Sequence, residues 1–305
     1  MGFFDLQVNG YGGVDFNGDD LDVDALESAC RLMEADGVDG FLATVITDDL
    51  DKMASRIANV VRLREQSSTA RRLIAGLHIE GPFLSPEPGY RGAHPLAAIK
   101  SADVDEMSRL LDAGGGLIRL VTLAPEHDAG RRVTRMLTGA GVIVSAGHCN
   151  PTVDELSAAV DAGVSMFTHL GNATPMQMHR HDNIIQRALS LSDRLWCCFI
   201  ADGVHVDFTA LKNYLRLVGP DRAIVVTDAV APAGLGPGHY RYFGRDVKIG
   251  SDLVAMAPDG SHLIGSAVTM SRAFDNLTSA CGLSEEHARR LTSTNPRKAI
   301  GIGKH

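Results

Sequence analysis

Short apolar runs and longer amphipathic segments alternate along most of the chain. Eight runs have the length and composition of buried strands: Phe3–Val8, Gly40–Ile46, Leu73–Glu80, Leu117–Leu123, Val142–Ala146, Val164–His169, Leu195–Ala201 and Ala223–Asp228. Helical periodicity marks the segments Leu21–Ala35, Leu50–Arg64, Ala102–Leu111, Ala129–Thr138, Thr152–Ala162 and Phe208–Val218. Alternating strands and helices are typical of a parallel sheet with crossover helices, and eight such units predict a closed α/β barrel, the (β/α)8 or TIM barrel.

The pattern changes after the eighth predicted strand. Residues 229–264 are rich in glycine, proline and aromatic residues, and Tyr240–Phe243 and Val247–Ile249 flank Gly244 as a predicted hairpin. Three further helices are predicted, over Ala267–Ala280, over Ser284–Thr292 and from Asn295 onward. Since no linker rich in proline, glycine or serine divides the chain, we expect one catalytic domain over residues 1–305.

Two consecutive predicted strands end at a histidine. His148 follows Val142–Ala146 after one glycine, and His169 is the last residue of the next strand. In a parallel barrel the carboxyl ends of all strands lie at the same edge, so we expect the two imidazoles to be neighbours that can share a metal ion. For either histidine alone, a buried side chain satisfied by one hydrogen bond is the alternative.

A carboxylate at the end of a third strand completes this pattern. Glu80 ends the run Leu73–Glu80, and Gly81-Pro82 then break the strand where a barrel loop should begin. One glutamate and two histidines make a three-ligand set that leaves a coordination position open, as in catalytic zinc sites. His78 faces the same side of the strand as Glu80 and is either a further ligand or a group that orients one; we leave it out of the predicted set.

Asp228 follows the fully apolar strand that begins at Ala223. It should therefore project into the mouth of the barrel. Burying a carboxylate there without a partner would cost several kcal/mol, which a nearby cation can offset. We predict that Asp228 is a general base, with a structural carboxylate as the alternative.

Composition narrows the class of function. The 305 residues are 45% hydrophobic and carry a formal net charge of −8, which disfavours nucleic acid or an anionic membrane as the main partner and favours a small-molecule substrate. Five cysteines at irregular spacing fit neither a disulfide framework nor a paired-cysteine zinc site. No apolar run approaches the ~20 residues of a membrane span and the first residues lack a signal-peptide pattern, so we expect a cytoplasmic protein.

Ten phrases along the chain resemble one known family. In order they are DLQVNGYGGVDF (5–16), HIEGPFLSP (78–86), GAHP (92–95), TLAPE (122–126), SAGHCNPT (145–152), THLGNA (168–173), IADGVHVD (200–207), VTDAVAPAG (226–234), GSAVTM (265–270) and STNPRKAIG (293–301). Together they look like the N-acetylglucosamine-6-phosphate deacetylases of the amidohydrolase superfamily. The resemblance implies a metal-dependent TIM-barrel hydrolase that removes the acetyl group from an amino sugar phosphate, without the flanking β-sandwich that the family usually carries.

The resemblance also implies roles for single residues. Glu80, His148 and His169 match the ligands of the catalytic divalent metal, zinc in the first place, which agrees with the set reached from the strand ends. Asp228 matches the catalytic acid and base, and His94 matches the residue that polarises the substrate carbonyl. Gln7 and Asn9 stand where many relatives have a His-x-His pair; that difference implies one metal ion rather than two, because an amide oxygen is a poor zinc ligand.

For the substrate, the resemblance places Asn172 and Ala173 in the segment whose backbone contacts the sugar phosphate. It places Arg180 and His205 in the phosphate region, which the family completes across a homodimer interface. Asp182 would repel a phosphate dianion unless it pairs with Arg180 or a neighbouring histidine.

Three other functions remain open at this point, one of them a different amidohydrolase that releases another acyl group or acts on a cyclic amide. Where the family usually continues with Glu-Pro-Gly after Arg180, this chain has His181-Asp182-Asn183. An unphosphorylated or differently configured N-acyl amino sugar is therefore the alternative substrate. A sugar-phosphate-binding protein without catalysis is the alternative class of protein.

Overall fold

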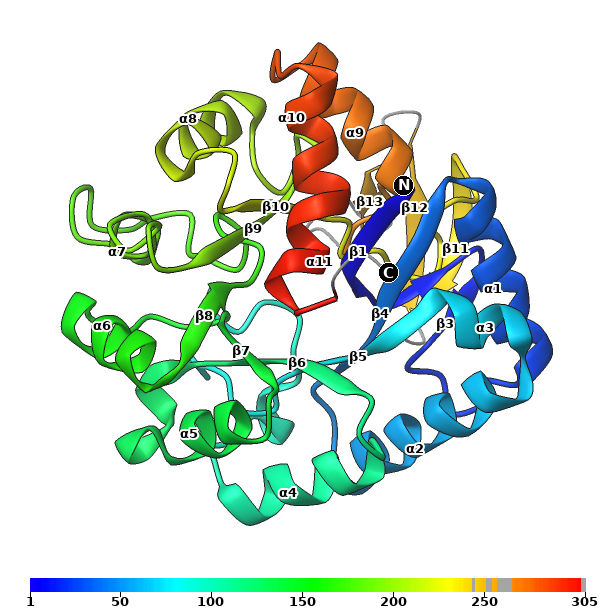
Figure 1. Cartoon of the computed structure of the whole chain (residues 1–305), viewed down its shortest axis with the longest axis horizontal. Helices are drawn as coiled ribbons and strands as arrows, with labels where there is room; N and C mark the ends of the chain where they lie inside the picture. The colour runs from blue at the N-terminus through cyan, green and yellow to red at the C-terminus, as the bar shows by residue number, and fades with distance from the viewer. Residues whose placement is uncertain (243–244, 251–253, 257–264, 303–305) are drawn as a thin grey trace.

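The computed structural model describes residues 1–242, 245–250, 254–256 and 265–302. Eight parallel strands follow one another around a barrel in chain order (Figure 1). They are β1 (Phe3–Val8), β4 (Val38–Ile46), β5 (Ile74–Glu80), β6 (Ile118–Leu123), β7 (Ile143–Ala146), β8 (Val164–Phe167), β9 (Trp196–Ile200) and β10 (Ala223–Val226). All eight predicted strands are confirmed, each within two residues of its expected ends.

Helices on the outside of the barrel connect the strands. They are α1 (Val23–Ala35), α2 (Leu50–Gln66), α3 (Ser68–Leu73), α4 (Val104–Ala113), α5 (Arg132–Gly139), α6 (Val153–Ala162), α7 (Ile184–Leu189) and α8 (Phe208–Val218). The short connections contain the strands β2 (Gly10–Tyr11) and β3 (Val14–Asp15) and the 3-10 turns η1 (Leu96–Ala98), η2 (Pro125–His127) and η3 (Ala129–Arg131). The six predicted helices of this region are confirmed, and α3 and α7 are additions that the sequence pattern did not predict.

The chain after the barrel folds back onto it. A three-stranded antiparallel sheet contains β11 (Gly238–Tyr242), β12 (Arg245–Ile249) and β13 (Ala255–Met256), followed by α9 (Met270–Ser279), α10 (Glu285–Arg289), the π-helical turn η4 (Arg290–Thr294) and α11 (Asn295–Ala299). The predicted hairpin is confirmed by the pairing of β11 with β12, although Phe243 and Gly244 of its turn lie outside the described residues. Among the described residues, no helix is both long and apolar enough to cross a membrane.

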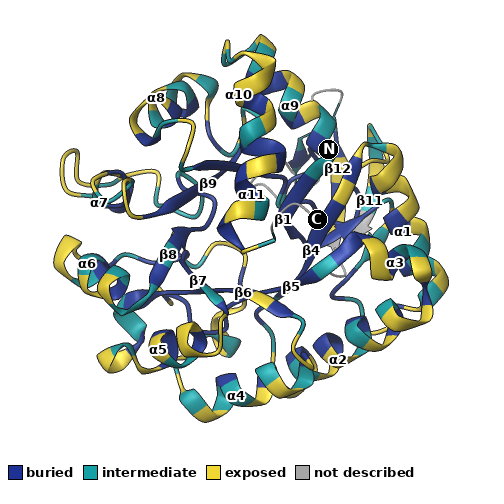
Figure 2. Cartoon of the chain, viewed as in Figure 1, coloured by how far each residue is buried: buried dark blue, intermediate teal, exposed yellow. Residues whose placement is uncertain are grey.

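The helices bury one face against a barrel that is itself buried on both sides (Figure 2). In α1 the buried residues Leu26, Cys30 and Met33 recur at helical spacing, and burying a leucine or methionine side chain contributes about 1.5–3 kcal/mol. Helix α6 begins with a capping box, in which Thr152 and Glu155 each accept a hydrogen bond from the other's backbone N–H. Such caps fix where each helix begins, and so where the preceding loop leaves the barrel.

The barrel is not closed by a continuous strand ladder. β1 pairs with β4 and β10 pairs with β9, but between β1 and β10 the described residues show a single parallel bridge, from Val8 to Ala229. Figure 1 shows α11 lying across the barrel end beside β1 and β10, and both η4 and α11 contact the two strands. The junction between these two strands, the β1–β10 seam, is therefore closed largely by contacts from η4 and α11 and not by strand pairing.

Candidate metal centre and active site

Glu80, His148 and His169 converge at one edge of the barrel. Glu80 is the last residue of β5, and the histidines follow β7 and β8. Glu80 Oε1 lies 3.0 Å from His169 Nε2 and 3.3 Å from His148 Nε2, and the two Nε2 atoms are 3.1 Å apart. These are the three residues that the strand ends predicted, and the structure brings them together with all three side chains buried.

The chemistry of these three side chains fits a divalent cation. His148 Nδ1 donates to the carbonyl of Tyr90 at 2.9 Å, which leaves the lone pair of Nε2 free to bind a metal. Ligand atoms around a tetrahedral zinc ion stand about 3.3 Å apart, given bonds of about 2.0–2.1 Å. Two nitrogen lone pairs and a carboxylate oxygen at 3.0–3.3 Å match this spacing.

Electrostatics keep the glutamate ionised. Burial by itself would raise the pKa of Glu80, but hydrogen bonds and charges from His148 and His169 hold it well below its usual range. Gln7 Nε2 donates a further hydrogen bond to Glu80 Oε1 at 3.0 Å. Gln7 therefore acts as a hydrogen-bond donor to the carboxylate.

Asp228 lies just after β10, at the same end of the barrel. Its pKa is raised to about 6, first because the surrounding protein desolvates it and then because of the charge of Glu80. Asn9 Nδ2 donates to Asp228 Oδ1 at 2.8 Å, which orients the carboxyl group. A carboxyl group with a pKa near the working pH can both accept and return a proton.

The backbone at three of these positions is strained. His148, His169 and Asp228 have φ values of 50°, 30° and 51°, in the left-handed region that residues other than glycine seldom adopt. Each follows the end of its strand, so this turn of the backbone is what directs the three side chains into the mouth. Strain of this kind concentrates at functional sites, where it costs about 1–3 kcal/mol per residue.

His94 lies against the metal cluster as a neutral imidazole. Its ring stacks edge-on against that of His148 with centroids 4.4 Å apart, and its Nε2 is 4.0 Å from Glu80 Oε2. Burial lowers the pKa of His94 to about 3, and the charge of His148 adds to the effect. Its Nδ1 is buried without a hydrogen-bond partner in the described part of the chain.

His78 lies one layer deeper in the barrel. Its Nε2 is 2.8 Å from Thr122 Oγ1, which in turn lies 2.7 Å from Thr168 Oγ1. Burial lowers the pKa of His78 to about 4. His78 thus belongs to a hydrogen-bonded chain that runs through Thr122 and Thr168 to Ser145, and not to the cluster of Glu80, His148 and His169.

The expected substrate residues lie on loops of the same barrel end. Asn172 and Ala173 follow β8, and Ala173 has a left-handed backbone with φ of 48°. His205, after β9, holds its Nδ1 2.6 Å from Asp202 Oδ2. Arg180 is exposed and makes no hydrogen bond or ion pair to any other described residue.

Asp182 is paired differently from either expectation. Arg187 Nε donates to Asp182 Oδ1 at 2.6 Å, and this ion pair lowers the pKa of Asp182. Arg187 belongs to α7, the helix that the sequence pattern did not predict. The Asp182 carboxylate therefore pairs with Arg187 and not with Arg180 or a neighbouring histidine.

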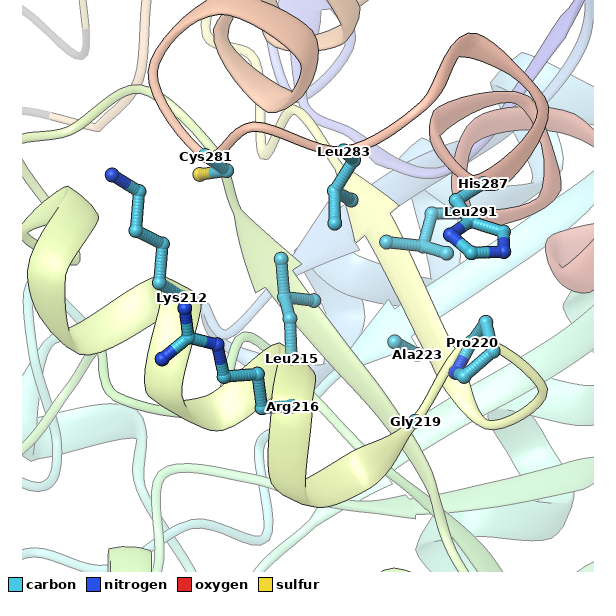
Figure 3. A pocket seen from close by; sticks show the side chains of 10 residues that line it. All are labelled: Lys212, Leu215, Arg216, Gly219, Pro220, Ala223, Cys281, Leu283, His287 and Leu291. Carbon is cyan, nitrogen blue, oxygen red and sulfur yellow. The ribbon is translucent and has the colours of Figure 1, made fainter.

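A cavity of about 180 Å³ lies away from this cluster, between α8 and the C-terminal helices (Figure 3). Leu215, Leu283 and Leu291 line its apolar part, and Lys212 and Arg216 of α8 stand along one side. Ala223, at the start of β10, also lines it. Asp228 lies beyond the other end of that strand, so this cavity is not part of the site.

Several residues of the site were not found from the sequence. The backbone carbonyl of Tyr90 could not be found from the sequence, because every residue has a backbone carbonyl. Asp5, which hydrogen-bonds Thr227 and the backbone of Gln7, did have a signal: it is a charged residue inside a buried strand.

Comparison with known proteins identifies the family. No protein-family model matches the chain. The chain is 34% identical over 312 residues to the N-acetylglucosamine-6-phosphate deacetylase of Bos taurus, covering 99% of this chain and 74% of that protein. It is 32% identical over 305 residues to the N-acetylgalactosamine-6-phosphate deacetylase of Shewanella sp. (strain ANA-3), covering 98% and 73%.

A solved structure agrees over the same range. A variant of N-acetyl-D-glucosamine-6-phosphate deacetylase from Mycobacterium smegmatis, in complex with N-acetyl-D-glucosamine-6-phosphate, superposes with a TM-score of 0.87 at 32% identity. The alignment covers 99% of this chain and 77% of that one. The likeness extends through the whole barrel, and the chain belongs to the N-acetylglucosamine-6-phosphate deacetylase family.

Proposed function

We propose that this protein hydrolyses the acetamide of N-acetylglucosamine 6-phosphate, giving glucosamine 6-phosphate and acetate. The observation that carries the proposal is the meeting of Glu80, His148 and His169 with Asp228 and His94 at one barrel mouth. A binding protein without catalysis would have no use for a proton-accepting carboxyl group beside three metal-ligand side chains. The family assignment supports the same reaction.

In this mechanism Glu80, His148 and His169 hold one divalent metal ion, which we propose to be zinc. When bound, the ion supplies Lewis acidity that polarises the acetyl carbonyl and makes water more acidic. Gln7 supports a single ion, since its side chain is already engaged as a donor to Glu80. A single bound equivalent of zinc, measured by elemental analysis, is the expected result.

Asp228 carries the proton. Its carboxylate accepts a proton from the attacking water, and the same carboxyl group then donates it to the departing amine nitrogen as the C–N bond breaks. Asn9 holds one carboxylate oxygen in place during both transfers. His94, neutral and with one ring nitrogen unpartnered, donates a hydrogen bond to the carbonyl oxygen as negative charge develops there.

The phosphate is the part of the substrate for which Arg180 is proposed. Its guanidinium is exposed and has no partner among the described residues, and a guanidinium offers paired donors that suit phosphate oxygens. His205 supports the same region, and the backbone of Asn172 and Ala173 would contact the sugar. The Asp182–Arg187 ion pair leaves Arg180 free for this role.

We further propose a homodimer and a cytoplasmic location. The loops after β8 and β9 expose the apolar side chains of Met176 and Val204, a surface that a second subunit would cover. The five cysteines are free, and four of them are buried, as in proteins of a reducing compartment. Residues 1–305 would act as one catalytic domain.

The function is tested by acetate release from a panel of sugars. The panel holds N-acetylglucosamine 6-phosphate, N-acetylgalactosamine 6-phosphate and unphosphorylated N-acetylglucosamine, each with the zinc-loaded protein. We expect the highest kcat/KM for the first. Preference for the galacto sugar would move the proposal to the other activity named among the relatives, and no acetate from any sugar would refute the proposed reaction.

A further inference from the structure

The β1–β10 seam is the weak point of the barrel, and it passes directly beneath Asp228. Apart from the bridge between Val8 and Ala229, the two strands share no ladder. At the far end of the seam, Asn295 Nδ2 donates to the carbonyls of Ala223 (2.7 Å) and Pro220 (2.8 Å). Ser293 Oγ (2.7 Å) and Arg297 Nη1 (3.3 Å) of the same C-terminal segment donate to the carbonyl of Gly2, just before β1. This segment therefore bridges the two strands at that end.

Nearer the active site, the carboxylate of Asp5 supplies the hydrogen bonds that strand pairing would otherwise make. Thr227 Oγ1 donates to Asp5 Oδ2 at 2.5 Å, and Thr227 N lies 3.3 Å from both carboxylate oxygens. Asp5 Oδ1 also accepts from the backbone N–H of Gln7 at 3.1 Å. One buried carboxylate in the middle of β1 thus joins that strand to the residue that follows β10.

These contacts hold the backbone on both sides of Asp228. Thr227 precedes it, and Ala229 follows it and donates its N–H to Thr227 Oγ1 at 3.2 Å. The hydroxyl of Thr227 therefore accepts from Ala229 and donates to Asp5. Asp228 lies between the two anchored residues with its left-handed φ of 51°, a conformation that persists only where its surroundings enforce it.

The same carboxylate is connected to the metal cluster. Gln7, whose N–H it accepts, donates from its side chain to Glu80. Burial raises the pKa of Asp5 to about 7, against hydrogen bonds from Thr227 and Gln7 that lower it. Because burial of this carboxyl group opposes folding at neutral pH, stability alone is a poor reason for its presence.

We propose that Asp5 is a positioning residue for the catalytic carboxyl group of Asp228. It replaces the missing hydrogen bonds between β1 and β10, and through Thr227 it fixes the strained backbone that aims Asp228 at the substrate. This inference rests on the proposed function, because it assigns Asp5 to the proton-transfer step of that reaction. In the described part of the chain Asp5 hydrogen-bonds Gln7 and Thr227, and none of the three proposed metal ligands.

The test compares variants at the two ends of the seam. Asp5→Asn keeps the size of the side chain, and Thr227→Val keeps its shape but removes the hydroxyl. Each should lower kcat by about 10–100-fold, the effect of a small misplacement of a catalytic group, with KM for N-acetylglucosamine 6-phosphate within about threefold of wild type and bound zinc unchanged. Thr227→Ser restores the hydroxyl and should restore kcat.

Asn295→Ala is the matched control, because it removes the hydrogen bonds to Pro220 and Ala223, on the β10 side at the other end of the same seam. It should lower Tm and leave kcat near the wild-type value. The double variant Asp5→Asn/Thr227→Val should lose no more activity than the worse single variant, since both changes break one interaction. If Asp5→Asn does not fold, Thr227→Val and Thr227→Ser decide the question.

The proposal would be overturned by wild-type kcat in both Asp5→Asn and Thr227→Val, by an equal loss of kcat in Asn295→Ala, or by loss of zinc from Asp5→Asn. Amide hydrogen exchange gives a readout independent of turnover. Exchange at residues 227–229 should quicken in Asp5→Asn and Thr227→Val but not in Asn295→Ala, and unchanged exchange in both would also overturn the proposal. Absence of turnover by the wild type counts against the proposed function instead, and the exchange measurement then still tests whether Asp5 and Thr227 fix the backbone around Asp228.

Discussion

The proposed metal site and the proposed phosphate segment differ in how their side chains are held. Glu80, His148 and His169 are buried at the ends of strands, and their positions are fixed by neighbours such as Gln7 and the carbonyl of Tyr90. The phosphate segment around Arg180 is an exposed loop between β8 and α7, and Arg180 itself has no partner among the described residues. The proposed chemistry is thus held by buried strand ends, whereas the proposed recognition of the phosphate rests on an exposed loop.

This difference predicts how steeply activity depends on each region. Loss of a strand-end side chain should abolish metal binding or proton transfer, because no neighbouring residue can take over either role. Loss of a loop group should remove only the binding energy of that group.

Removing a metal ligand should have the largest effect. His148→Ala and His169→Ala each take away one of three ligands, so both proteins should lose most of their bound zinc and nearly all acetate release. Elemental analysis after purification without chelator measures the metal, and circular dichroism checks the fold. Unchanged metal content in both variants would show that the cluster is not the metal site.

Asp228→Asn should leave the metal in place and still stop turnover. The amide cannot accept the proton from water, so we expect kcat to fall by about 10²–10⁴-fold, the usual contribution of a general base. Zinc content and Tm serve as controls, since the substitution preserves the size of the side chain. A variant with near wild-type kcat would exclude Asp228 as the base.

The pH dependence of kcat/KM should report the same group. In the proposed reaction Asp228 acts as a carboxylate, and its pKa is raised to about 6 by desolvation, so the rate should fall as the pH drops and the base becomes protonated. The positive charge of a bound cation lowers this pKa, which places the acid limb at or below about pH 6. A rate that rises as the pH falls from 7 to 5 would contradict this assignment.

Arg180→Ala should have the smallest effect of the four, confined to the phosphate. In wild type we expect N-acetylglucosamine 6-phosphate to exceed its unphosphorylated form in kcat/KM by at least about 10–100-fold, equivalent to a charge-assisted hydrogen bond of about 1.5–3 kcal/mol. That preference should collapse in the variant. Arg194→Ala, which breaks the exposed pair with Asp161, is the control and should keep it.

Equal constants for both sugars in wild type would remove the contrast between the two regions. They would indicate that the loop does not recognise phosphate, and that the substrate is an unphosphorylated amino sugar. In that case the Arg180→Ala result would carry no information, and the panel of N-acetyl sugars would define the substrate.

The strand ends could be predicted from the sequence because each polar residue there follows an apolar run. Glu80, His148, His169 and Asp228 all carry this signal, and parallel topology then places them together. The resemblance added His94, which follows no strand. The geometry confirms that the metal-ligand side chains converge, while their functional roles stay predictions until variants are measured.

Other parts carried too little signal. Helices α3 and α7 have six residues each, too short for a helical period to stand out from the flanking loops. Missing α7 hid Arg187, and with it the true partner of Asp182. The Asp5–Thr227 contact joins residues 222 positions apart, and no local pattern reveals such a pairing.

The left-handed backbone at His148, His169 and Asp228 has a consequence for evolution and engineering. At each of these positions glycine would adopt the same turn without strain, so activity and foldability select different residues at the same place. Selection for thermal stability without an assay for turnover should therefore favour glycine at these strand ends. The resulting variants would be more stable but would lack the side chains proposed to bind the metal.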